Sequence, residues 1–236
     1  PGIICAQLDR ELKEKSGQEL RFHPSTTGQA TLGGFIAGGS GGVGSVHWGG
    51  LRDLGNVLRL RIVTLEEEPR VMELTARDLL KVSHAYGTNG IITEVEMPLA
   101  PAYDWVDVIV GHETFMDAVR FSDRLAKSSG ILVKEIAPIA APVPYEYFTR
   151  HKPWLKEGEA VTVVMVAPHA LAPFEALVKL MKGEIRFRAD EVESLRGIPR
   201  AYELGWNHTT LRALRVDPAW TYLQVLYPFP NQLALS

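Results

Sequence analysis

Apolar residues recur at a helical spacing near the start of the chain. Ile4, Leu8 and Leu12 lie four residues apart among charged and polar residues, which predicts a helix over residues 4–15 with one apolar face. Gly17 follows the last periodic position and predicts the end of this helix.

An alternation of apolar and polar residues begins at residue 57. Residues 57–65, with the sequence VLRLRIVTL, predict a half-buried strand. Two further strands are predicted over residues 71–74 and 91–97. Between them, Thr75 is the expected N-cap of a short helix over residues 76–83.

The second half of the chain repeats the order strand, helix, strand. Its predicted strands cover residues 103–110, 131–136, 160–167 and 184–188, and its predicted helices cover residues 113–128 and 171–181. This βαββαβ order is the ferredoxin-like plan. A further strand is predicted over residues 221–227 without an obvious partner, so we describe the plan as incomplete. The patterns together predict an α+β protein with two domains, residues 1–101 and 102–236.

Glycine is concentrated between Gly28 and Gly55. Backbone entropy opposes a helix here, and so many glycines suit a chain that turns repeatedly or approaches a ligand closely. Residues 39–44 match G-x-G-x-x-G, but the region around Trp48 leaves no space for the helix that a nicotinamide-dinucleotide site needs, so we reject that interpretation. Interspersed apolar residues such as Phe35 argue against a flexible linker. The remaining interpretation is a backbone cradle for a large cofactor that carries phosphate.

Composition narrows the classes of function. The net charge of −3 gives no bulk attraction to nucleic acid or to an anionic membrane. The sequence contains no run of about 18 consecutive apolar residues, so no membrane span is predicted. Cys5 is the only cysteine, which excludes an intramolecular disulfide and a multi-cysteine metal site and fits a reduced, cytoplasmic setting. The chain opens on Pro-Gly, and we expect it to be a fragment of a longer protein.

The glycine segment also carries a specific resemblance. The matching pieces are Ala30-Thr31-Leu32-Gly33-Gly34, Ile36-Ala37, Gly41-Gly42, Ser45, Trp48-Gly49, Arg52-Asp53 and Gly87-Thr88-Asn89-Gly90-Ile91-Ile92-Thr93. In this order they resemble the second half of the PCMH-type FAD-binding domain of the vanillyl-alcohol oxidase superfamily, above all enzymes of the glycolate oxidase and D-lactate dehydrogenase type. Gly39, His47 and Asn89 depart from the family pattern. The first FAD subdomain of that family would precede Pro1 and is absent from this chain.

The resemblance implies that the chain binds FAD. By matching positions, the residues that would line the flavin nucleotide are Thr31, Gly33, Gly34, Ser40, Gly41, Gly42, Ser45 and Gly49, and the residues that would approach it through backbone groups are Gly90, Ile91 and Ile92. For each glycine, the alternative is a turn without a ligand.

The resemblance further implies that residues 102–236 form a cap over the substrate face of the flavin. No His-x-His cluster is present, so no metal site is predicted. His208, within Gly205-Trp206-Asn207-His208-Thr209-Thr210, is the candidate catalytic residue because an imidazole can act as a base. The alternative is a histidine satisfied in a loop or helix cap, with Asn207 or Thr209 capping a helix over residues 211–214.

We therefore predict a fragment of an FAD-dependent dehydrogenase or oxidase. It would oxidise a small substrate, with a 2-hydroxy acid as the candidate, by hydride transfer to the flavin. The alternative is a truncated or degenerate relative that binds a partner and no flavin. The sequence leaves open the substrate, the electron acceptor and the formation of a homo-oligomer.

Overall fold

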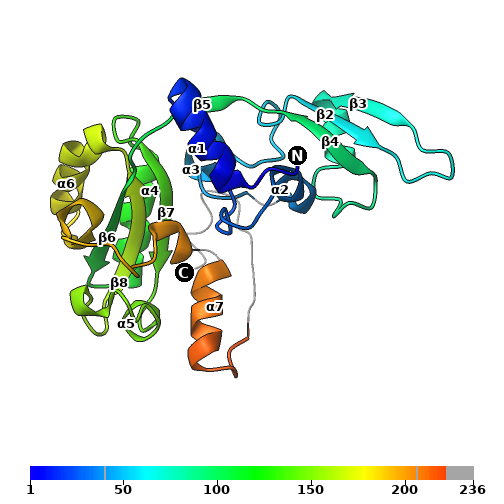
Figure 1. The fold of residues 1–236 in the computed structure, drawn as a ribbon. Helices are drawn as coiled ribbons and strands as arrows, with labels where there is room; N and C mark the ends of the chain where they lie inside the picture. Colours follow the sequence, from blue (N-terminus) through cyan, green and yellow to red (C-terminus); the bar gives the residue numbers. More distant parts are fainter. Residues whose placement is uncertain (40, 206, 222–236) are drawn as a thin grey trace. The chain divides into compact units, whose positions relative to one another are not determined.

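A computed structural model describes residues 1–39, 41–205 and 207–221. The chain divides into two compact units, Pro1–Tyr103 and Asp104–Ser236. Each contains buried hydrophobic side chains. Figure 1 draws the helices and strands of the chain as a ribbon. Within the described ranges, no helix has the length and apolar character needed to cross a membrane.

The first unit combines short helices with two antiparallel sheets. Its helices are α1 (Cys5–Ser16), α2 (Leu32–Gly38), α3 (Ser45–Trp48) and the 3-10 helix η1 (Ala76–Lys81), and its strands are β1 (Gln18–Leu20), β2 (Arg59–Val63), β3 (Val71–Thr75), β4 (Ile91–Glu96) and β5 (Leu99–Pro101). β1 pairs with β5, and the other sheet has the order β3-β2-β4. The helix and the three longer strands predicted from periodicity are confirmed.

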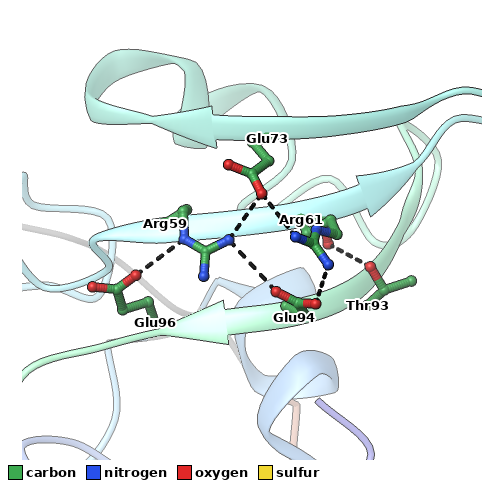
Figure 2. Close-up of polar contacts among 6 residues, drawn as sticks. All are labelled: Arg59, Arg61, Glu73, Thr93, Glu94 and Glu96. Carbon is green, nitrogen blue, oxygen red and sulfur yellow. Dashed lines mark hydrogen bonds and ion pairs between the residues drawn. The ribbon is translucent and has the colours of Figure 1, made fainter.

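One face of the β3-β2-β4 sheet carries a ladder of charges. Alternate residues of β2 are buried, and the intervening Arg59 and Arg61 lie between carboxylates of both neighbouring strands (Figure 2). Arg59 contacts Glu73 at 3.1 Å and Glu96 at 3.0 Å, while Arg61 contacts Glu73 at 3.0 Å and also pairs with Glu94. Because these side chains are at least 32% exposed, each pair adds little stability, and the ladder mainly favours the observed register.

The expectation of a glycine segment without a helix is wrong at α2. Thr31 caps this helix, since its Oγ1 accepts a hydrogen bond from the N–H of Gly34 at 3.1 Å. Leu32, Phe35 and Ile36 are buried in the core of the first unit. Burying each of these side chains stabilises the fold by about 1.5–3 kcal/mol. That gain exceeds the roughly 0.5–1 kcal/mol that each helical glycine costs in backbone entropy.

The predicted N-cap at Thr75 is also wrong. The Thr75 side chain makes no capping hydrogen bond, and the helix that follows is the 3-10 helix η1. Ala76 has a φ of 49°, in the left-handed region, so the first turn departs from the geometry that an N-cap hydroxyl needs.

The second unit is built on a four-stranded antiparallel sheet. Its strands are β6 (Val106–His112), β7 (Val133–Ile139), β8 (Ala160–Val166) and β9 (Glu184–Arg188), and its helices are α4 (Phe115–Ala126), α5 (Val143–Tyr147), α6 (Leu171–Leu180) and α7 (Asn207–Val216), with 3-10 helices η2 (Lys152–Trp154), η3 (Pro168–Ala170), η4 (Ala189–Glu191) and η5 (Ala201–Glu203). The sheet order is β7-β8-β6-β9, with α4 after β6 and α6 after β8. The predicted α+β class and ferredoxin-like plan are confirmed.

The core of the second unit surrounds the two central strands. All seven residues of β6 and all seven of β8 are buried. Phe121 of α4 and Phe174 of α6 meet edge to face with ring centroids 6.1 Å apart, so both helices cover the same side of the sheet. The strand predicted over residues 221–227 lies, apart from Thr221, outside the described residues.

Two buried histidines are expected to make the second unit sensitive to acid. Burial lowers the pKa of His112 from 6.5 to about 4, and burial together with the nearby charge of Arg212 does the same for His151. The unfolded chain restores the ordinary pKa, so it binds more protons than the folded chain between pH 4 and pH 6.5. The free energy of unfolding should therefore be highest above pH 6.5 and fall as the pH drops toward 4. At pH 5 the expected loss, relative to neutral pH, is about 2 kcal/mol per histidine.

We expect His112→Gln to remove part of this acid sensitivity. Nε2 of His112 lies 3.0 Å from Oγ1 of Thr162, a contact that a glutamine amide can replace without titrating. The difference in urea midpoint between pH 7 and pH 5 should be smaller in the variant than in the unaltered chain. An equal loss on acidification in both would show that His112 does not carry the effect.

Candidate functional site

The predicted cofactor contacts of the first unit lie on three segments. Thr31, Gly33 and Gly34 lie at the start of α2, Gly41, Gly42, Ser45 and Gly49 lie in the loop that contains α3, and Gly90, Ile91 and Ile92 lie at the start of β4. The fold brings two of these segments together because α2 packs against β4, and the loop leaves directly from the end of α2. Ser40 lies outside the described residues.

The first turn of α2 is not an open anion site. Its N–H groups donate to acceptors within the chain: Leu32 to the carbonyl of Ile3 at 3.0 Å, Gly33 to the carbonyl of Pro1 at 2.8 Å, and Gly34 to Oγ1 of Thr31 at 3.1 Å. A ligand at this turn would therefore have to use contacts other than these three donors.

The loop after α2 is pinned to the core, and two of its N–H groups have no hydrogen-bond partner among the described residues. His23 and Val43 exchange backbone hydrogen bonds of 3.1 and 2.8 Å, and the hydroxyl of Ser45 donates to the carbonyl of Gly42 at 2.8 Å. Within the described ranges, the N–H groups of Gly41 and Gly42 have no hydrogen-bond partner. Successive open N–H groups in such a loop can bind a phosphate oxygen.

The fold requires glycine at one position of this region and not at another. Gly42 has a φ of 84°, and a Cβ there would lie 2.7 Å from the carbonyl oxygen of His23, so the fold itself requires glycine. Gly38 has no such φ, and among the described residues no atom outside its chain neighbours and the backbone of α2 lies within 4 Å of where its Cβ would be. The fold therefore does not require glycine at position 38, which makes it a candidate for close ligand approach. Residue type alone does not separate these two cases, and Gly38 is not among the contacts predicted from the sequence.

The start of β4 presents one of its two isoleucines outward. Ile91 is 59% exposed as a whole residue, whereas Ile92 packs against the core of the first unit. Ile91 is therefore the residue of this pair whose side chain can contact a ligand, and Ile92 can do so through its backbone.

His208 lies in the first turn of α7 in the second unit. Its Nδ1 is 3.4 Å from the carbonyl oxygen of Tyr202. Thr209 does not cap a helix, because α7 already begins at Asn207 and the Thr209 hydroxyl donates to the carbonyl of Leu204. Trp206 lies outside the described residues. The catalytic role of His208 stays a prediction.

Among the described residues, neither Cys5 nor a cluster of metal-ligating side chains forms a reactive centre. Burial, with a smaller contribution from the charge of Asp9, raises the pKa of the Cys5 thiol to about 11, so it is not an activated nucleophile. In the ranges that the structure covers, no group of three or more His, Cys, Asp or Glu side chains could hold a metal ion.

Comparison with known families decides the cofactor. Residues 1–71 match the family described as "FAD binding domain". Residues 1–71 are therefore similar to an FAD-binding domain. The predicted FAD cofactor is thereby confirmed, with residues 1–71 as the part of the chain that carries the match. No curated protein matches the chain.

Two solved structures show the same fold. The chain is similar to alkyldihydroxyacetonephosphate synthase in P212121, with a TM-score of 0.62 and 19% identity, and in P1, with a TM-score of 0.61 and 17% identity. Each match covers 86% of this chain and 41% of the other. The chain thus spans about two fifths of the length of these structures. The resemblance to PCMH-type FAD-binding proteins is confirmed, while the narrower similarity to glycolate oxidase and D-lactate dehydrogenase stays a prediction.

Proposed function

We propose that the chain is part of an FAD-dependent oxidoreductase that oxidises a small substrate. The observation that carries this proposal is the match of residues 1–71 to an FAD-binding domain. FAD, when bound, accepts a hydride from a C–H bond of the substrate. The residues of the chain then have to hold the cofactor, orient it and accept the proton of the substrate hydroxyl.

The open loop donors suit a flavin dinucleotide. In this proposal the N–H groups of Gly41 and Gly42 donate to phosphate oxygens, and the exposed side chain of Ile91 packs against an apolar part of the cofactor. The other predicted contacts are Thr31, Gly33, Gly34, Ser40, Ser45, Gly49, Gly90 and Ile92.

The proposed substrate class is a 2-hydroxy acid, with His208 as the base. If Nδ1 of His208 donates to the carbonyl of Tyr202, Nε2 is left as the acceptor for the proton of a substrate hydroxyl. A synthase reaction is the second candidate, and the name of both similar structures favours it.

A visible absorbance spectrum of the 236-residue chain, taken before and after incubation with FAD and dialysis, tests the cofactor. We expect a flavin band that survives dialysis. Absence of the band would contradict flavin binding by this chain and favour the alternative of a non-catalytic relative.

Anaerobic addition of D- and L-2-hydroxy acids tests the substrate class. We expect one of them to bleach the flavin band, and we expect His208→Gln to slow bleaching by about 10²-fold or more while leaving the band itself intact. A stable band that no 2-hydroxy acid bleaches would reject this substrate class and leave the synthase candidate. Equal rates in both proteins would remove His208 from the site.

A further inference from the structure

Two residues beside the glycine loop hold a backbone conformation that their side chains disfavour. His84 has a φ of 64° and Tyr86 a φ of 51°, both in the left-handed region. Residues with a Cβ rarely adopt this region, and glycine would adopt it without strain. Strain of this kind persists where the surrounding structure or a function maintains it.

The fold explains the backbone of this segment but not its side chains. The N–H of His84 donates to the carbonyl of Ile36 at 3.1 Å, and the N–H of Tyr86 donates to the carbonyl of Ala37 at 3.0 Å. These bonds satisfy carbonyl groups at the C-terminal end of α2. Glycine at both positions would make the same bonds with less strain, so the choice of histidine and tyrosine needs another reason.

The two side chains form an exposed, hydrogen-bonded pair. Nε2 of His84 lies 2.8 Å from Oη of Tyr86, and the ring centroids are 5.1 Å apart at an angle of 57°. Tyr86 as a whole residue is 74% exposed. The imidazole therefore holds the phenol in place while most of the phenol surface stays open.

The pair lies against the loop that carries the predicted cofactor contacts. A Cβ on Gly39 would overlap Cβ of His84, so the histidine touches the residue that ends α2 and begins this loop. Tyr86 is also only a few residues before Gly90 and Ile91, at the start of β4.

The surroundings favour an uncharged ring over a phosphate at this place. The N–H groups of His84 and Tyr86 already donate to carbonyls at the C-terminal end of α2, so they are not available to a phosphate. An open tyrosine face suits a planar aromatic ring, which gains from stacking and needs no charge.

We propose that the His84–Tyr86 pair is an aromatic platform on which a planar heteroaromatic ring of bound FAD stacks. The ring is either the isoalloxazine or the adenine. This inference rests on the proposed FAD-binding function. The hydrogen bond between the imidazole and the phenol restrains the phenol before the ligand arrives, so less rotamer freedom is lost on binding.

Titration of the 236-residue chain with FAD, riboflavin and ADP tests the platform. We expect Tyr86→Ala to weaken FAD binding about tenfold, the typical loss of one stacking contact. Tyr86→Phe keeps the ring and should bind FAD within about threefold of the unaltered chain. Phe115→Ala, which removes an exposed ring from the second unit, is the matched control and should leave the affinity for FAD unchanged.

Riboflavin and ADP identify the ring. Weaker riboflavin binding in Tyr86→Ala assigns the isoalloxazine, and weaker ADP binding assigns the adenine. If neither is weakened, or if Tyr86→Phe loses as much affinity as Tyr86→Ala, the ring does not stack there and the platform is rejected.

Tyr86→Gly separates the platform from a structural role. It should raise the thermal midpoint, because glycine relieves the left-handed strain, and it should weaken FAD binding as much as Tyr86→Ala. A lower midpoint would instead indicate that the side chain supports the fold. Failure of the unaltered chain to bind FAD would overturn the proposed function, whereas equal FAD affinities in all variants would overturn the platform alone.

Discussion

Replacing Arg200 with alanine is expected to lower the free energy of unfolding of the second unit by about 3 kcal/mol. Nε of Arg200 lies 2.5 Å from Oδ2 of Asp107, and Nη2 lies 3.1 Å from Oδ1, which makes the pair bidentate. The side chain of Asp107 is only 5% exposed. Without the guanidinium, its carboxylate would be left buried without a counter-charge.

The opposite replacement should cost much less. The hydrogen bond to Asp107 raises the pKa of Arg200, and the Arg200 side chain is 42% exposed, so water can hydrate the guanidinium when Asp107 is changed. In Asp107→Asn, the amide oxygen can still accept from the N–H of Ala201, which lies 3.0 Å from Oδ2. We expect this variant to lose about 1 kcal/mol.

Urea denaturation followed by circular dichroism measures both losses. Arg120→Ala is the matched control, because Arg120 pairs with Asp117 on α4 with 59% of its side chain exposed, and its removal should change stability by less than about 0.5 kcal/mol. Equal losses in Arg200→Ala and Asp107→Asn would contradict the asymmetry, since it depends on only one of the two charges being buried.

Local pattern was sufficient where a regular period decided the structure. β2 follows the alternation of residues 57–65, and α4 and α6 lie where helical spacing placed them. The pattern failed at α2 because the helix is stabilised by packing against residues distant in the sequence. Leu32, Phe35 and Ile36 gain their stability from core residues far along the chain, while the glycine cost is visible in the segment itself.

The same distinction limits what could be predicted of the site. The motifs between Ala30 and Asp53 lie within residues 1–71, which match an FAD-binding domain, whereas the motif Gly87–Thr93 lies outside that match. They did not show that the N–H groups of Leu32 and Gly33 are used by the carbonyls of Ile3 and Pro1, because those bonds join distant parts of the sequence. Nor could they show the left-handed backbone of His84 and Tyr86, since neither residue type favours that conformation.

Replacing Gly44 with alanine is expected to destabilise the first unit by about 3 kcal/mol. Gly44 has a φ of 110°, outside the range that residues with a Cβ tolerate. An added Cβ would also overlap the carbonyl oxygen of Arg21, so the chain on both sides must move. That movement would strain the paired hydrogen bonds between His23 and Val43 that pin the loop.

Gly38→Ala is the matched control, and it separates stability from ligand binding. Among the described residues, no atom outside its chain neighbours and the backbone of α2 lies within 4 Å of the added methyl. Its helical position favours alanine over glycine by roughly 0.5–1 kcal/mol, so the urea midpoint should rise slightly. If the cofactor approaches the end of α2, this more stable variant should bind FAD more weakly, whereas Gly44→Ala should lose both stability and FAD. Unchanged FAD affinity in Gly38→Ala would mean that the ligand does not approach there. Unchanged stability in Gly44→Ala would show that the loop does not hold the left-handed turn on which the open donors of Gly41 and Gly42 depend.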